Sequence, residues 1–356
     1  MTKSANVVLR SLGFFIFLSF VVLMYTVVFR NIYFYYFESY NLYAVLSSLA
    51  LIFIILLFFM LSHLFANFLV IFFKRVINSL VGVFFIFFFV FIILEVLRFF
   101  NLTNKIYFYT CLVVGTLIVI YSIVNAFDVK VNNVEIFSEK LDKEYKIIVV
   151  SDLHIGSNPV SDMNKAIDLI NRQNADIVLI PGDFVDEDFV FKEDLSQLRE
   201  IKAKVYYSYG NHETYLKTDV EKELSSYNIT FLRNKSVEFD KNLHIIGVDD
   251  NFNKLNASLS KIKIEKKQYN LLMNHQPTEI DVANKRNIDL MVSGHTHNGQ
   301  IFPFNYLVKT RYKYIKGLYE YSGTKLFVST GTGTWGPKMR LGSDNELVII
   351  TLKPQK

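Results

Sequence analysis

Long runs of apolar residues without a polar face fill the first third of the chain. Four of them reach the roughly 20 residues that cross a bilayer, at 7–29, 42–73, 80–100 and 106–127. A buried helix of a soluble protein is also apolar, but segments such as 84–94 contain no polar residue, which is typical of a membrane span. The pattern therefore predicts an all-α transmembrane region of four helices over residues 1–128.

The first run has a second interpretation, a signal peptide, because Lys3 and Arg10 precede its apolar core. It is longer than a typical signal sequence and has no small-residue cleavage site before Arg30, so a membrane span is favoured.

Four spans place both ends on one side, and the basic residues of the short flanks then favour a cytoplasmic C-terminal domain. They are Lys3, Arg10, Lys74, Arg75 and Lys130 on the side of the ends, against Arg30, Arg98 and Lys105 on the other. We expect a multi-pass protein of the cell (inner) membrane.

Two ionisable residues lie within the predicted spans, and such residues are functional candidates by default. Glu95 precedes Arg98 by one helical turn, so a local ion pair explains it. His63 has no evident partner in the sequence. A transport role is therefore the less favoured interpretation of these spans.

The pattern changes after Asp128. Residues 129–145 mix polar and apolar positions, which predicts a connecting strand or hairpin, and the last domain then covers 146–356. Its first half alternates strands with helices at 162–174 and 192–201, which favours a parallel sheet with ligand-binding residues at the carboxyl ends of the strands. The predicted strands cover 147–150, 177–180, 205–209, 243–248, 269–273, 289–292, 325–329 and 346–352.

Composition and charge narrow the function classes. The chain is 51% hydrophobic with 34 Phe, and few of its 38 basic and 33 acidic residues lie in the first third. The rest is close to neutral, so the net charge of +5 gives no basic patch and argues against nucleic-acid binding. The single cysteine, Cys111, excludes an intrachain disulfide.

Polar motifs follow five of the predicted strands. They are Asp152-Leu153-His154, Gly182-Asp183-Phe184-Val185-Asp186, Gly210-Asn211-His212-Glu213, Asn274-His275 and Gly294-His295-Thr296-His297. Asp152 and His154 are two residues apart, so their side chains leave an extended backbone on the same face. Five of the seven histidines lie in these motifs, which favours one shared site, whereas His244 lies inside a strand and is expected to be structural.

Carboxylate, imidazole and amide ligands together suit Mn, Fe, Zn or Co better than Mg or Ca. The number of candidate ligands exceeds what one ion needs, so we predict two divalent metal cations. Two ions roughly 3.5 to 4 Å apart can activate a shared water as hydroxide for attack at phosphorus. This chemistry predicts phosphoester hydrolysis.

The ordered set of five motifs resembles the calcineurin-like metallophosphoesterase superfamily over about residues 145–352. The segment 331–340 is similar to the membrane-associated bacterial YkuE-like branch. The resemblance implies an α/β fold in four layers, a sandwich of two mixed β-sheets flanked by helices. One departure is Ser151, which stands where Gly often precedes the aspartate, and we expect no loss of activity from it.

The resemblance also implies roles for individual residues. Asp152, His154 and His297 would bind the first metal, Asn211, His275 and His295 the second, and Asp183 would bridge the two. His212 resembles the general acid that protonates the leaving oxygen, and Glu213 would position it. Asp186 would support the loop or a ligand histidine. Arg340 or Lys338 would meet a phosphate, unless the segment is a plain surface loop.

These features imply a membrane-anchored hydrolase of a phosphomonoester, phosphodiester or pyrophosphate bond. The substrate is either lipid-linked, which would explain the membrane region, or soluble. A catalytically inactive relative would be expected to lack ligands, and all are present here. A membrane transporter or sensor with a regulatory phosphoesterase-like domain is the remaining alternative, although few polar residues lie in its spans.

Overall fold

The computed structural model describes residues 3–37, 41–62, 68–102, 104–250 and 254–355. The chain divides into two compact units, 1–121 and 122–356, and each is described by itself. His63 lies outside the described residues.

The first unit is helical. Its helices are α1 (Lys3–Phe37), α2 (Asn41–Ser62), α3 (Phe68–Phe99) and α4 (Lys105–Asn125), the last of which extends into the second unit. Within the described residues, four helices are long and apolar enough to cross a membrane, as predicted. The predicted break near Lys74 and Arg75 is wrong, because α3 continues through it. No glycine or proline interrupts 74–79, and long basic side chains can extend from a helix toward the interface.

A polar cluster joins α1 and α3. Asn31, which is fully buried, donates to Glu95 at 2.8 Å and accepts from Arg98 at 3.0 Å. The predicted pair of Glu95 and Arg98 is present at 2.9 Å, and Arg30 lies 3.3 Å from Glu95. These contacts satisfy the charge of Glu95 within the helix bundle, so the cluster supports a structural role.

The second unit contains two six-stranded mixed sheets. The first has the order β1 (Val129–Ser138), β12 (Asn345–Pro354), β2 (Tyr145–Val149), β3 (Ile177–Ile180), β4 (Lys204–Tyr207) and β5 (Ile229–Phe231). The second has the order β10 (Gly317–Tyr321), β11 (Thr324–Val328), β9 (Leu290–Ser293), β8 (Tyr269–Asn274), β7 (Leu243–Val248) and β6 (Lys235–Glu238). Neighbours are parallel except for the pairs β12–β2, β10–β11 and β6–β7.

Alternate residues of the central strands face each other between the sheets. Ile147 and Val149 of β2 share one buried cluster with Leu271 and Met273 of β8. The intervening residues face outward and are covered by helices, because side chains alternate along a strand. These helices are α5 (Val160–Arg172), α6 (Val220–Glu223), α7 (Leu255–Leu259) and α8 (Ile280–Lys285), and the unit also contains α9 (Phe304–Arg311), which has no buried residue.

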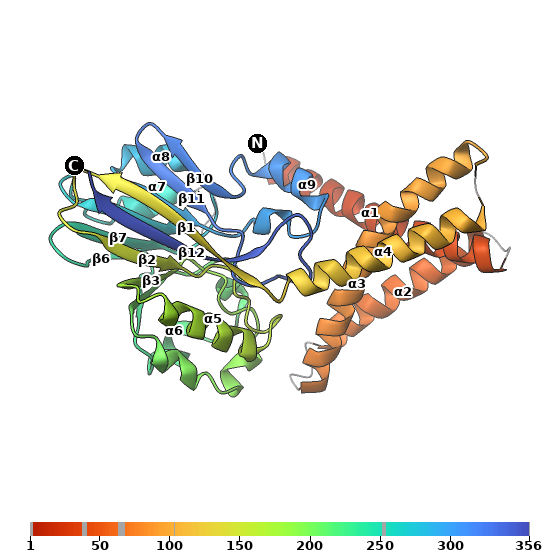
Figure 1. Cartoon of the computed structure of the whole chain (residues 1–356), viewed down its shortest axis with the longest axis horizontal. Helices are drawn as coiled ribbons and strands as arrows, with labels where there is room; N and C mark the ends of the chain where they lie inside the picture. The colour runs from red at the N-terminus through yellow and green to blue at the C-terminus, as the bar shows by residue number, and fades with distance from the viewer. Residues whose placement is uncertain (1–2, 38–40, 63–67, 103, 251–253, 356) are drawn as a thin grey trace. The chain divides into compact units, whose positions relative to one another are not determined.

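Figure 1 shows α5 and α6 outside one sheet and α7 and α8 outside the other. On α5, the buried Met163 and Ile167 line the same small apolar space as Val178 and Ile180 of β3. This arrangement confirms the predicted four-layer α/β sandwich of two mixed sheets flanked by helices.

The predicted helix 192–201 is wrong. The chain instead forms two 3₁₀ helices, η1 (Asp188–Lys192) and η2 (Ser196–Glu200). Leu195, Leu198 and Ile201 are buried at a spacing of three, which fits 3.0 residues per turn as well as an α-helix. Asp194 accepts from the Ser196 amide at 2.9 Å, and this local turn separates the two segments.

Candidate metal centre

The polar motifs meet where strands of both sheets end. The loops after β2, β3 and β4 carry the first three motifs, and those after β8 and β9 carry the other two. Because these strands are parallel within each sheet, their carboxyl ends lie at a common edge. The fold thus brings together side chains from residue 152 to residue 297.

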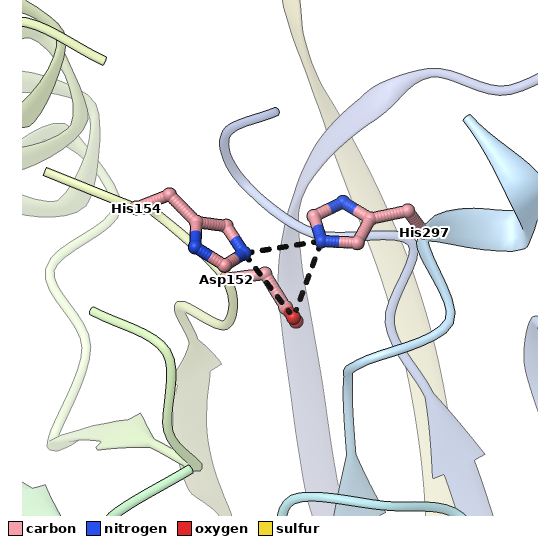
Figure 2. Close-up of side chains that lie close together, drawn as sticks. All are labelled: Asp152, His154 and His297. Atoms are coloured by element: carbon pink, nitrogen blue, oxygen red, sulfur yellow. Dashed lines mark hydrogen bonds and ion pairs between the residues drawn. The ribbon is translucent and has the colours of Figure 1, made fainter. Parts of the chain in front are cut away.

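One group of candidate ligands consists of Asp152, His154 and His297, the residues that the resemblance assigns to the first metal. Asp152 Oδ1 lies 3.4 Å from His297 Nε2 and 3.9 Å from His154 Nε2, and the two Nε2 atoms are 3.2 Å apart (Figure 2). All three side chains are buried. Figure 2 shows the three ligand atoms turned toward one common point.

A second group consists of Asp183, His275 and His295. Asp183 Oδ2 lies 3.0 Å from His275 Nε2, which is 3.2 Å from His295 Nδ1. The same Oδ2 is 3.9 Å from His154 Nε2, so Asp183 borders both groups. Asn211 Oδ1 is buried and accepts no hydrogen bond from the described residues, which suits an atom reserved for a metal.

The residues therefore fit a pair of divalent cations. Each group offers at least three oxygen or nitrogen atoms within 4.8 Å of one another. The donor set combines carboxylate, imidazole and amide, which borderline divalent metals accept. The assignment of single residues as ligands stays a prediction.

His212 lies on the more exposed side of the groups. Its Nε2 is 4.0 Å from Asp183 Oδ2, and its side chain is 19% exposed. Its ring centroid lies 4.7 Å from that of His154 and 5.9 Å from that of Trp335. His212 is thus placed beside the metal groups but within reach of solvent.

Five candidate ligands have a left-handed backbone. The φ angles of Asp152, His154, Asp183, His295 and His297 are 54°, 50°, 52°, 69° and 47°. L residues with a side chain seldom adopt this region, and it concentrates at functional sites where the surrounding fold enforces it. The strain is consistent with loops shaped to direct these side chains to one point.

Two motif glycines leave room for the ligands. A Cβ on Gly294 would overlap Ser151 and the carboxylate of Asp152, and one on Gly210 would overlap the carboxylate of Asp183. These positions therefore need glycine because of close approach.

Hydrogen bonds orient the histidine rings. The Nδ1–H of His275 donates to the Pro181 carbonyl at 3.0 Å, which fixes the ring with Nε2 toward Asp183. Asp186 Oδ2 lies 3.5 Å from Nδ1 of His154, and the same carboxylate accepts from the Ser157 amide at 2.9 Å. Asp186 thus contacts both a loop and a candidate ligand.

Tyr312 orients His295, and sequence analysis missed it. Its hydroxyl donates to Gln276 Oε1 at 2.8 Å and lies 2.8 Å from His295 Nε2. Because the single hydroxyl proton is used on Gln276, the hydroxyl accepts from the Nε2–H of His295. Nδ1 of His295 is then available to a metal. Tyr312 follows α9 and no sequence motif includes it.

Glu213 holds two motif loops together. Its buried carboxylate accepts from the amides of Asp183, Phe184 and Gly210 at 3.0, 2.7 and 2.8 Å. It also accepts from the Tyr207 hydroxyl at 2.6 Å. These contacts fix the loops that present Asp183 and Asn211, whereas the sequence had suggested that Glu213 positions the His212 side chain.

Arg340 differs from both interpretations made of it. It is fully buried, so it lies neither in a surface loop nor at a position for meeting a phosphate. Its guanidinium donates to the carbonyls of His297, Thr330 and Gly333 at 2.9, 2.7 and 2.6 Å and to Asn345 at 2.7 Å. It supports the loop that carries His297. A buried arginine could not be foreseen because its acceptors come from four separate positions.

The neighbouring Lys338 pairs with Asp162. That contact occupies its ammonium group on the side of α5.

Burial and nearby charges shift the pKa values of two candidate ligand histidines in opposite directions. Burial lowers the pKa of His275, but the carboxylates of Asp183, Asp152 and Asp250 outweigh it and raise this pKa to about 10. Burial and the nearby His275 instead lower the pKa of His295 to about 3. In the metal-free protein, the proton on His275 thus offsets the negative charge of the neighbouring carboxylates. A bound metal ion would take over that role, so metal binding should release protons.

Comparison with known proteins agrees with the fold and the site. Residues 145–299 match the calcineurin-like phosphoesterase family. An uncharacterized metallophosphoesterase of Helicobacter pylori strain J99 is 36% identical over 239 residues, 64% of each chain, so the match spans just under two thirds of that relative. One of Campylobacter jejuni is 33% identical over 272 residues, 72% of each chain. A "transmembrane protein with metallophosphoesterase domain" of Danio rerio is 30% identical over 274 residues, 68% of this chain and 62% of that protein.

Proposed function

This chain belongs to the calcineurin-like metallophosphoesterase family, and from that premise we propose that it is a membrane-anchored phosphoester hydrolase dependent on two divalent metals. The observation that supports the proposal most directly is the position of Asp183 Oδ2, 3.0 Å from His275 Nε2 and 3.9 Å from His154 Nε2. One carboxylate between two groups of ligands suits a bridge between two ions.

In this proposal Asp152, His154 and His297 hold the first metal. Asn211, His275 and His295 hold the second, and Asp183 is shared. Mn, Fe, Zn and Co all suit the donor set. Two such cations supply a water of lowered pKa and neutralise charge on the attacked phosphate.

The chain's own residues supply the remaining steps. The left-handed loops and Glu213 keep the ligands in place before substrate binds, so little reorganisation accompanies reaction. His212, on the exposed side, donates a proton to the leaving oxygen. General acid catalysis of this kind contributes ~10²–10⁴-fold.

We propose that the substrate is a lipid-linked phosphoester and that the domain lies on the cytoplasmic side of the inner membrane. Four apolar helices in the same chain support a substrate held at a bilayer. The transporter or sensor alternative gains no support from the polar cluster of α1 and α3, because Glu95 is paired there.

The test uses the full-length chain in lipid nanodiscs, stripped of metal by a chelator and reloaded with Mn²⁺. We expect metal-dependent hydrolysis of bis-p-nitrophenyl phosphate. Asp183→Asn should abolish it and lower the content of both metals, because the shared carboxylate charge is lost. Asp281→Asn, a half-exposed carboxylate on α8, is the matched control and should behave as wild type. A folded protein holding two metals without turnover would refute the proposal.

A further inference from the structure

Large apolar side chains are exposed in one region of the catalytic domain. We call them the aromatic rim: Phe127, Phe302, Phe304, Tyr306, Leu307 and Trp335. Each is between 42% and 61% exposed. Clustered exposed apolar side chains mark an interaction surface more often than isolated ones do.

Hydrogen bonds join the segments that bear the rim. The Phe302 amide donates to the Leu341 carbonyl at 2.8 Å, and the Leu341 amide donates to the Gln300 carbonyl at 3.0 Å. The Gln300 side chain accepts from the Trp335 amide at 2.9 Å and donates to the Trp335 carbonyl at 2.9 Å. The rings of Phe302 and Tyr306 are 5.8 Å apart. The rim is therefore one surface drawn from distant parts of the sequence.

The end of the last apolar helix joins the same segments. The Arg340 amide donates to the Ser122 carbonyl at 2.8 Å. Asn125 donates to the Arg340 and Ser343 carbonyls at 3.3 and 3.2 Å. Figure 1 shows α9 at the end of the domain where α4 continues into β1. The rim thus borders the point at which the chain leaves its membrane-spanning helix.

Basic side chains accompany the rim. Lys309 Nζ lies 5.9 Å from the ring centroid of Tyr306, and Lys338 Nζ, which is paired with Asp162, lies 4.4 Å from that of Phe127. The described structure buries no residue of α9. Aromatic rings mixed with lysine are typical of protein surfaces at the level of lipid headgroups, where rings enter the interface and lysines meet anionic lipids.

The rim also reaches the metal centre. The ring of His212 lies 5.9 Å from the ring of Trp335 and 6.2 Å from the ring of Tyr215. Tyr215 is 74% exposed. The exposed side of the candidate site therefore adjoins the rim.

We infer that the aromatic rim lies in the headgroup region of the bilayer that holds the chain's own helices. This contact places the mouth of the metal centre at the membrane surface. The substrate class that such a site takes is an amphiphilic phosphoester whose head group lies at that surface. The statement on substrate rests on the proposed phosphoesterase activity, whereas the membrane contact does not.

The chain offers its own probe, because Trp335 is the only tryptophan. Full-length protein is placed in nanodiscs of phosphatidylcholine and phosphatidylglycerol, with or without brominated acyl chains. We expect brominated lipid to quench Trp335 emission and acrylamide in the water to quench it weakly. Phe304→Ser combined with Leu307→Ser should reduce quenching by lipid and increase quenching by acrylamide.

The matched control is Leu318→Ser combined with Tyr321→Ser. Both residues lie on β10, outside the rim, and their side chains are 42% and 38% exposed. It should quench as wild type does. Strong quenching by acrylamide with none by brominated lipid would overturn the inference, because the rim would face water. Protection from both quenchers would also overturn it, because a second copy or another protein segment would then cover the rim.

A second readout separates the inference from the proposed function. Turnover of an alkyl p-nitrophenyl phosphodiester embedded in the nanodisc is compared with that of soluble bis-p-nitrophenyl phosphate. The rim variant should slow the embedded ester by roughly tenfold, since it removes two apolar side chains from the interface, and leave the soluble ester unchanged. Equal effects on both esters would refute the substrate class. No turnover of either ester would refute the proposed function, and lipid quenching would still decide the contact.

Discussion

Tyr312→Phe is the substitution that tests the site geometry most directly. It removes one oxygen and keeps the ring, which lies 5.3 Å from the ring of His295. The loss leaves His295 Nε2–H and Gln276 Oε1 without the partner that each has at 2.8 Å. His295 can then change its tautomer, and the proton would move to the Nδ1 that faces the second metal position.

The magnitude follows from the contacts. An unpaired buried donor costs about 1–3 kcal/mol, and loss of a group that orients a metal ligand typically lowers affinity 10–100-fold. Gln276 keeps its two bonds to Asp250, which limits the disturbance. We therefore expect about a tenfold loss in affinity for the second metal and little change for the first.

Titration of the metal-free, full-length protein with Mn²⁺, followed by calorimetry and by the paramagnetic signal of the coupled pair, measures the two affinities. Tyr314→Phe is the control, because the Tyr314 ring packs on Tyr319 at 4.7 Å, away from the histidines. Equal second-metal affinity in Tyr312→Phe and wild type would refute the role of Tyr312. A matched fall in Tyr314→Phe would show a general loss of stability instead.

Three further predictions concern loops, acid stability and the leaving group. Glu213→Gln should lower the free energy of unfolding by about 1.5–3 kcal/mol, because the new amide group would face backbone donors. Urea unfolding followed by Trp335 fluorescence measures this loss, and Glu223→Gln at an exposed position is the control. The pKa of Asp240 is lowered to about 2, because bonds from the amides of Asn242 and Leu243 and from Lys143 and Tyr145 outweigh burial. The stabilisation that ionised Asp240 provides is therefore present above about pH 4 and is lost as the pH falls toward 2. The difference in unfolding free energy between wild type and Asp240→Asn should vanish over that range. A difference that stays constant with pH would contradict this prediction. His212→Ala should slow esters with poor leaving groups by ~10²–10⁴-fold and activated esters much less; equal slowing would exclude the acid role.

The elements that the sequence predicted well are those whose pattern is local. The strand predicted at 243–248 is β7, since all six of its residues are buried and all but His244 are apolar or glycine. The helix predicted at 162–174 is α5, since its apolar face repeats at helical spacing. The order of the metal motifs was equally readable, because each follows a strand directly.

The elements that it missed depend on distant partners. The strands β5, β6 and β10 are three to five residues long and largely exposed, so no alternation distinguishes them from loops. Tyr312 and Arg340 act on histidines that lie 17 and 43 residues away in the sequence, and nothing local reports those contacts. The sequence does not predict the continuous α3, because the charged residues Lys74 and Arg75 interrupt its apolar pattern.

The charges around the site indicate what kind of substrate it can hold. Asp152 and Asp183 are the carboxylates of the two ligand groups, and the carboxylates of Asp186, Glu213 and Asp250 lie close to them. Burial lowers the pKa of Arg340 to about 10, which still leaves its guanidinium charged at neutral pH, behind His297. A divalent cation bound as proposed would attract an anion that reaches it directly, and this attraction is strong where the dielectric is low. An anionic phosphoester would gain from that attraction and a neutral ester would not, so the proposed cations and the proposed ligand geometry favour the same substrate class.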